Sequence, residues 1–103
     1  MSDPMRIRAQ QKGDFTEVRV LMAHVMETGQ RKDAAGNIVP AFHIQTVTAT
    51  WNGKPVLSAQ FGPAVSQNPV MNFTFKGGAK GDKVVVTWTD TKGDKRTDEA
   101  VIA

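Results

Sequence analysis

The sequence predicts an all-β fold in which about seven antiparallel strands form a two-sheet sandwich. The first observation is a series of short runs in which apolar and polar residues alternate, a pattern typical of half-buried strands. The second is that Gly, Asn, Asp and Pro clusters separate these runs, at the roughly 8–12-residue spacing of all-β sandwiches and barrels. The 103 residues suit one domain, which we expect to span 1–103.

The first two predicted strands form a hairpin near the N-terminus. The strand from Met5 to Gln11 alternates apolar residues with arginine and glutamine. The turn Lys12-Gly13-Asp14 leads into a second strand, from Phe15 to about Val25. A long polar stretch from Glu27 to Asn37 then separates this hairpin from the next strand.

A second predicted hairpin occupies the middle of the chain. Its first strand runs from Phe42 to Trp51, and its apolar residues change parity along the run. A one-residue bulge near Gln45 or Thr46 would return them to one face. The strong hairpin signal Asn52-Gly53 then leads to a strand from Val56 to Phe61.

Three further strands complete the prediction. We expect a loop from Pro63 to Pro69 because proline cannot donate to a sheet ladder. The last strands run from Val70 to Lys76, Lys83 to Asp90 and Lys95 to Ile102. Seven strands with few helix signals favour an immunoglobulin-like β-sandwich. A five-stranded OB-type barrel is the alternative.

Two predicted strands are apolar on both faces, which a sandwich with a solvated outer face does not require. The runs are Val20 to Ala23 and Val84 to Val86. Central strands with a few exposed aliphatic residues are one interpretation. The other is that a second chain covers an outer face, and its candidate contacts are Leu21, Ala23 and Val85.

The composition removes several kinds of chemistry. There is no cysteine, so this chain contains no thiol nucleophile, zinc–thiolate site or iron–sulfur cluster. A metal site of His24, His43 and Glu27 can be drawn, but nothing in their spacing favours it. None of the three serines lies in a Gly-x-Ser-x-Gly motif. We therefore expect no catalytic residue, no metal and no cofactor.

The net charge of +3 is well below that of a dedicated nucleic-acid binder. If the strands alternate in direction, several basic loop residues gather at one end of the sandwich. Solvated turn charge is the ordinary interpretation, and docking of an anion or an acidic partner is the functional one. The candidates are Arg31, Lys32, Lys92 and Arg96. A small basic β-barrel that binds nucleic acid is the alternative function, although the aromatic residues occupy core-like positions.

The sequence pattern predicts neither a membrane-spanning helix nor a signal peptide. No apolar run approaches the roughly 18–20 residues of a membrane-spanning helix. The segment Met1 to Arg8 has no apolar stretch after its charges, so we expect no signal peptide.

Several long motifs, from the start to the end of the chain, carry a family resemblance. They are Met5-Arg-Ile-Arg-Ala-Gln10, Met26-Glu-Thr-Gly-Gln-Arg-Lys-Asp33 with Gly36 and Pro40, Phe61-Gly-Pro-Ala-Val-Ser66 with Asn68-Pro69, Phe73-Thr-Phe-Lys-Gly-Gly-Ala-Lys-Gly-Asp-Lys83, Trp88 and Lys92-Gly-Asp-Lys95. Through them the sequence resembles the SoxZ family, the Z subunits of the sulfur-oxidation carrier complex.

The resemblance implies an immunoglobulin-like sandwich that pairs with SoxY in the periplasm. SoxY carries sulfur intermediates on a cysteine in a flexible tail during oxidation of thiosulfate to sulfate, and the Z subunit is non-catalytic. The pair is either a heterodimer or a dimer of heterodimers, and it contacts other Sox enzymes transiently. The isolated subunit is expected as a monomer or a homodimer. Without a signal peptide of its own, it would be exported together with SoxY.

Overall fold

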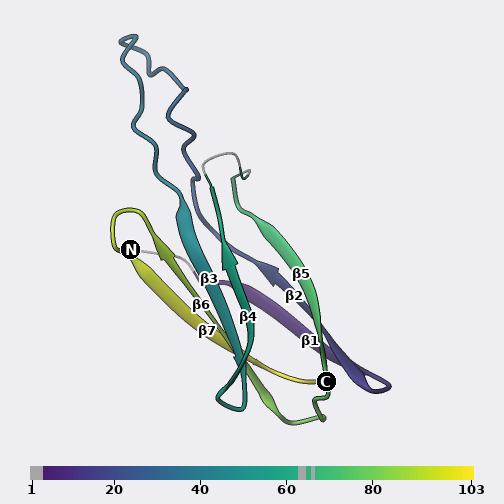
Figure 1. The fold of residues 1–103 in the computed structure, drawn as a ribbon. Helices are drawn as coiled ribbons and strands as arrows, with labels where there is room; N and C mark the ends of the chain where they lie inside the picture. Colours follow the sequence, from purple (N-terminus) through teal and green to yellow (C-terminus); the bar gives the residue numbers. More distant parts are fainter. Residues whose placement is uncertain (1–3, 63–64, 66) are drawn as a thin grey trace.

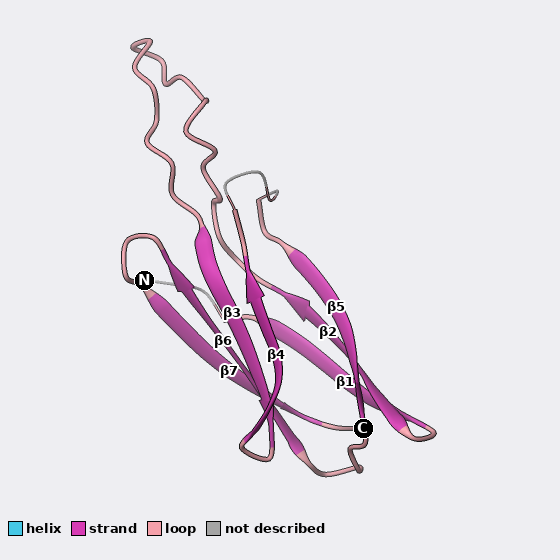
Figure 2. Ribbon diagram, in the orientation of Figure 1, coloured by secondary structure: helices cyan, strands magenta, loops and turns pink. Residues whose placement is uncertain are grey.

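The computed structural model describes residues 4–62, 65 and 67–103, and every regular element within them is a strand (Figure 2). Part of the predicted loop from Pro63 to Pro69 and part of the segment Met1 to Arg8 therefore lie outside the described residues. The strands are β1 (Arg6–Lys12), β2 (Phe15–Leu21), β3 (Ile44–Trp51), β4 (Lys54–Gln60), β5 (Val70–Lys76), β6 (Lys83–Asp90) and β7 (Lys95–Val101).

The seven strands form two separate antiparallel sheets, with orders β1-β2-β5 and β4-β3-β6-β7 (Figure 1). This arrangement confirms the predicted immunoglobulin-like sandwich, and the OB-type barrel is wrong because the described strands do not close into one sheet. The fourth strand pairs with β3, whereas constant-type immunoglobulin domains place their fourth strand in the other sheet. The sheet of β1, β2 and β5 therefore keeps a three-stranded outer face.

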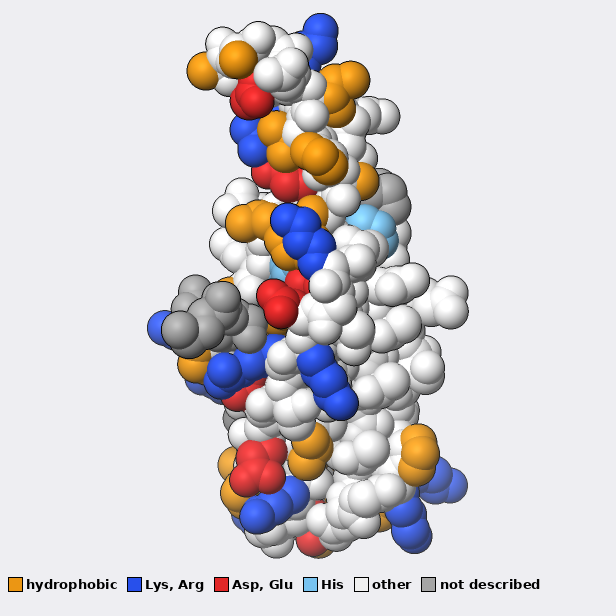
Figure 3. All heavy atoms as spheres, turned by 90° about the vertical axis from the view of Figure 1, so that its left-hand side faces the viewer, with side chains coloured by type: hydrophobic (Ala, Val, Ile, Leu, Met, Phe, Trp, Pro, Cys, Tyr) orange, Lys and Arg blue, Asp and Glu red, His pale blue; other side chains and the backbone are white. Residues whose placement is uncertain are grey.

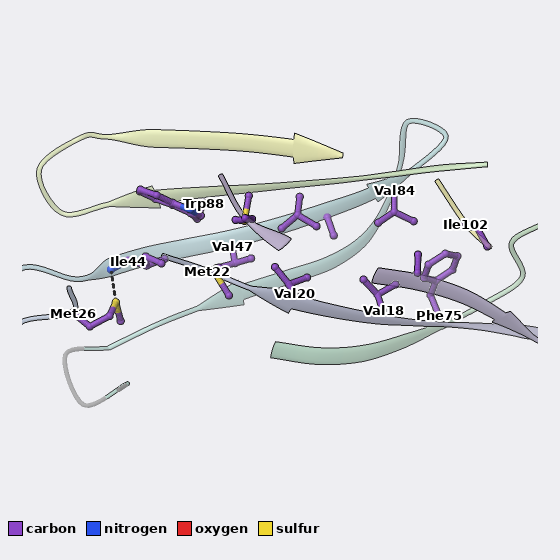
Figure 4. Close-up of a cluster of buried hydrophobic side chains, with 14 residues drawn as sticks. Val18, Val20, Met22, Met26, Ile44, Val47, Phe75, Val84, Trp88 and Ile102 are labelled. Carbon is purple, nitrogen blue, oxygen red and sulfur yellow. Dashed lines mark hydrogen bonds between the residues drawn. The ribbon is translucent and has the colours of Figure 1, made fainter. Parts of the chain in front are cut away.

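The core lies between the two inner sheet faces, where the alternating apolar residues meet (Figure 4). In β2, Val18 and Val20 are fully buried while their neighbours along the strand are exposed. In β6, Val84, Val86 and Trp88 face them from the opposite sheet with at most 1% exposure. The period-2 pattern thus determines which side of each strand is removed from water.

The predicted bulge in the third strand is confirmed. Pairing of β3 with β6 shifts register between Ile44 and Thr46. The shift leaves Ile44, Val47 and Ala49 on the buried face although their spacing along the sequence is irregular. An extra residue in one strand accounts for this change of parity.

The second strand ends earlier than predicted, at Leu21 and not near Val25. Its partner β5 begins at Val70, after Pro69, which has no backbone N–H to continue the ladder. Met22 N–H still donates to Pro69 O, at 2.9 Å. Single hydrogen bonds replace the ladder here, and the chain then leaves the sheet.

The predicted polar stretch forms a narrow ribbon, which we call the arm (residues 27–42). Two isolated bridges, Glu27 with Phe42 and Lys32 with Ile38, pair its two sides. The arm extends beyond the sandwich at the end where β2 leads into β3 (Figure 1). It contributes to the elongated shape of the molecule, whose principal extents are 53 × 20 × 18 Å.

Candidate functional site

The clearest exposed apolar surface lies at one end of the outer face of the sheet β1-β2-β5. Leu21 and Val70 are directly paired across strands β2 and β5, and they are 38% and 51% exposed. Ala23 follows Leu21 and lines a shallow hollow of about 300 Å³ with it. We call Leu21, Ala23 and Val70 the Leu21 patch. Two of the three predicted contact residues are therefore neighbours here.

The third predicted contact, Val85, lies on the outer face of the other sheet. It pairs with Thr50 on β3 and Glu99 on β7. Its surroundings are rich in threonine, at positions Thr46, Thr48, Thr50, Thr87, Thr89 and Thr97. Figure 3, seen from the side of the β6–β7 hairpin, shows a broad area of uncharged side chains and backbone. The structure therefore separates Val85 from Leu21, and one flat partner surface cannot cover both.

The β2–β3 and β6–β7 connections, which carry most of the predicted basic residues, meet at one end of the sandwich. Thr91 N–H donates to His43 O, at 3.0 Å. Lys92 lies in the β6–β7 turn at this end. Its Nζ is 4.2 Å from the ring centroid of Phe42 at the base of the arm, which is within the distance of a cation–π interaction. Lys32 lies farther out, on the exposed part of the arm.

The two predicted arginines at this end pair with carboxylates of the chain itself. Arg31 forms a two-pronged contact with Glu27, with Nη2 to Oε1 at 2.7 Å. The hydrogen bond from Arg31 lowers the pKa of the Glu27 carboxyl below its ordinary value. Arg96 contacts both carboxylate oxygens of Asp98, at 2.9 Å, and lowers the pKa of Asp98. The two guanidinium groups therefore form contacts within the arm and within β7.

The three residues weighed as metal ligands have separate local roles. The Nδ1 of His43 lies 2.8 Å from its neighbour Ile44 O, Glu27 binds Arg31, and His24 is buried beside Asp90. Across residues 4–62, 65 and 67–103, no group of three or more His, Cys, Asp or Glu side chains is placed to hold a metal ion.

The buried pair of His24 and Asp90 joins the base of the arm to the β6–β7 hairpin. His24 Nε2 and Asp90 Oδ2 are 3.2 Å apart, and both side chains are at least 96% buried. Met26 N–H donates to His24 Nδ1, at 3.0 Å. Since Nδ1 accepts this bond, the ring proton resides on Nε2 and is donated to Asp90. The imidazole is thus held from both sides.

Two aromatic rings pack against the His24 side of this pair. The His24 ring lies 4.6 Å from the Phe42 ring and packs edge-on against Trp88 at 5.3 Å, measured between centroids. Met26 turns the chain toward the arm with a φ of 51°, and its sulfur accepts Ile44 N–H (Figure 4). The arrangement anchors the arm to the sandwich.

Three arginines on the outer face of β1-β2-β5 are not among the residues predicted from the sequence. Arg8 lies directly opposite Arg19, and Arg6 lies one outward position along β1. The pairing of Arg8 with Arg19 could have been predicted from the sequence, because a two-residue turn at Gly13 and Asp14 sets the register of β1 and β2. Asp90 and Val70 were also missed, since their roles depend on strand neighbours distant in sequence.

These features define the chain as a two-sheet β-sandwich with an exposed apolar patch on one outer sheet face. A comparison with protein families matches residues 5–101 to the family of the sulphur oxidation protein SoxZ. The chain belongs to the SoxZ family, and its role is in sulfur oxidation. A comparison with curated proteins finds no match.

The fold also occurs in a solved structure, that of the hypothetical protein PH1083 from Pyrococcus horikoshii OT3. The two structures superpose with a TM-score of 0.67, over 99% of this chain and 89% of that one. At 16% identity, this similarity concerns the fold alone. No helix in the described part of the chain is long and apolar enough to cross a membrane.

Proposed function

We propose that this chain is the non-catalytic subunit of a periplasmic SoxYZ carrier. Its partner SoxY would carry the sulfur intermediates on a cysteine, because this chain contains no cysteine. In this division of roles SoxY performs the thiol chemistry. This chain binds SoxY and helps to present its cysteine to the enzymes. Family membership supports this proposal.

The observation that carries the pairing is the exposure of Leu21 and Val70, side by side on strands β2 and β5. Exposed apolar patches rimmed by polar residues are typical of protein interaction sites. Val25, 50% exposed, follows where the chain leaves β2. SoxY would therefore seat on the Leu21 patch, at the end of the sandwich from which the arm extends.

The arm and the β6–β7 hairpin would contact the enzymes that act on the carried sulfur. Arg31 and Arg96 are engaged by Glu27 and Asp98, so Lys32 and Lys92 are the better candidates for docking. Replacing both lysines with glutamine should lower carrier turnover at low salt and weaken its salt dependence. Unchanged turnover and salt dependence would reject this role.

Size-exclusion chromatography with light scattering, on this chain mixed with SoxY, tests the pairing. We expect a stable complex with either a 1:1 or a 2:2 composition. Leu21→Lys should disrupt it because it would bury an unpaired charge. Val85→Lys is the matched control on the opposite sheet, and it should leave the complex intact. Disruption by Val85→Lys alone would move the interface to the threonine-rich face.

Expression with and without SoxY tests co-export. We expect this chain in the periplasm only when SoxY, with its own export signal, is present. Arrival in the periplasm without SoxY would contradict this mechanism. Failure of the wild-type chain to bind SoxY in solution would contradict the carrier role itself.

A further inference from the structure

The outer face of the sheet β1-β2-β5 concentrates the positive charge of the protein. Its outward positions include five basic residues and one acidic residue, a net charge of +4 against +3 for the whole chain. The basic residues are Arg6, Arg8, Lys12, Arg19 and Lys76. The acidic residue, Glu17, already pairs with Lys12 at 3.2 Å. The three arginines therefore dominate the face next to the Leu21 patch.

The arginines are arranged in an electrostatically costly way. Arg8 and Arg19 are direct partners on neighbouring strands, where opposite Cβ atoms lie roughly 4.5–5.5 Å apart and like charges are destabilising. In the described part of the chain, no carboxylate forms a salt bridge with Arg6, Arg8 or Arg19. An anionic group between the two guanidinium groups would remove this repulsion.

The surface between these arginines is hollowed. One shallow hollow of about 310 Å³ is lined by Arg6, Ile7, Arg8, Arg19 and Leu21. A second, of about 170 Å³, adjoins it and is lined by Arg8, Gln10, Glu17, Arg19 and Asn72. Arg8 and Arg19 line both, and Leu21 lines both the first hollow and the one that contains Ala23. The charged surface and the Leu21 patch are thus continuous.

We infer that this face binds an acidic surface of the partner protein, with Arg8 and Arg19 facing partner carboxylates. The inference rests on the proposed pairing, and it specifies the partner chemistry opposite the arginines. Guanidinium groups match carboxylates through two parallel hydrogen bonds. Leu21 and Val70 supply the adjoining apolar contact, and arginine beside apolar side chains is a composition enriched in protein interfaces. The apolar contacts keep the partner bound, and the charges guide its approach.

A protein partner fits this face better than a nucleic acid. Single-stranded nucleic acids stack on aromatic side chains beside the basic groups. The residues around Arg8 and Arg19 are aliphatic, amide or charged. Phe15, the exposed aromatic residue of this face, pairs with Lys12 at the far end of the hairpin.

Association kinetics with purified SoxY, measured between about 0.02 M and about 0.5 M salt, test the inference. The test variant carries Arg8→Gln and Arg19→Gln. The matched control carries Lys80→Gln and Lys95→Gln, which remove the same charge from outside this face. We expect the test variant to associate about tenfold more slowly at low salt, with a weaker salt dependence. The association rate of the control variant at low salt should fall much less.

Two further measurements separate this inference from the proposed pairing. Leu21→Lys should mainly accelerate dissociation, and it should leave the salt dependence of association in place. The isolated arginine variant should melt at a higher temperature than the wild type at low salt, because the repulsion between positions 8 and 19 is gone. A lower melting temperature would show that the arginines stabilise the isolated fold, and would contradict the inference.

Other outcomes have distinct meanings. If wild type binds SoxY and both double variants behave alike, the pairing stands and the acidic partner surface is wrong. If wild type does not bind SoxY, both proposals fail. If a short single-stranded oligonucleotide binds through Arg8 and Arg19 while SoxY binding ignores them, the face is a nucleic-acid site and the inference is overturned.

Discussion

Replacing Asp90 with alanine should destabilise the sandwich where the arm begins. The side chain of Asp90 is 1% exposed. Its Oδ1 accepts the N–H groups of Lys92 and Asp94, at 3.0 and 2.9 Å. Its Oδ2 lies 3.2 Å from His24 Nε2. One buried carboxylate thus closes the β6–β7 turn and orients the histidine at the same time.

The size of the effect follows from these three donors. Lys92 and Asp94 are exposed residues, so water can replace part of their lost hydrogen bonds. The His24 N–H is buried, and leaving such a donor unsatisfied costs about 1–3 kcal/mol. Together with the lost bonds to the turn, Asp90→Ala should cost about 3–5 kcal/mol in the free energy of unfolding.

Asparagine at position 90 separates the contribution of the two turn hydrogen bonds from that of the His24 hydrogen bond. Its carbonyl oxygen can accept both turn N–H groups, but its NH₂ group then faces His24 Nε2–H. The imidazole cannot move its proton to Nδ1 without losing the bond from Met26 N–H. Asp90→Asn should therefore cost about 1–2 kcal/mol, and it keeps the test valid if the alanine variant does not fold.

Urea unfolding, followed by tryptophan fluorescence and circular dichroism, measures these differences. The matched control is Asp94→Ala, an exposed side chain in the same turn, which should change stability by less than about 0.5 kcal/mol. Nitrogen NMR of His24 checks the tautomer directly. An Asp90→Ala cost below about 1 kcal/mol, or a proton found on Nδ1, would refute the reasoning.

Three other substitutions test the fold. Gly78→Ala should be strongly destabilising, because φ is +93° and an added Cβ would collide with Thr16 Oγ1; a far-ultraviolet melt would detect it, and wild-type behaviour would contradict the close approach. Ile44→Ala should cost about 2–5 kcal/mol in urea unfolding, since Ile44 is fully buried. The Arg96 hydrogen bond lowers the Asp98 pKa from its ordinary value of 3.8, so this stabilisation is present above about that pH and is lost as pH falls through the folded pKa. Asp98→Asn should make the free energy of unfolding depend less on pH in this range. An unchanged pH dependence would count against the Arg96–Asp98 pairing.

Much of the fold could be predicted from local pattern. Strands β5 and β6 have the expected bounds, and the bulge in β3 lies where the change of parity indicated. These features arise from alternation over a few residues and from the turn chemistry between them. The early end of β2 could not be read in the same way, because it depends on Pro69, which precedes the neighbouring strand β5.

The family resemblance also came from the sequence, and the match over residues 5–101 confirms it. The surface assignments needed the structure. Leu21 and Val85 have the same kind of local pattern, yet they face opposite sides of the sandwich because their strands belong to different sheets.

Thus the sequence by itself determined the strands apart from the early end of β2, their buried faces and the family. Only the tertiary structure brought His24 to Asp90, 66 positions away, placed Val70 beside Leu21, and showed Arg31 and Arg96 already paired. The physical reason is the separation along the chain between the residues that interact. Alternation and turns are decided between near neighbours, whereas a binding surface is decided by which distant strands pack side by side.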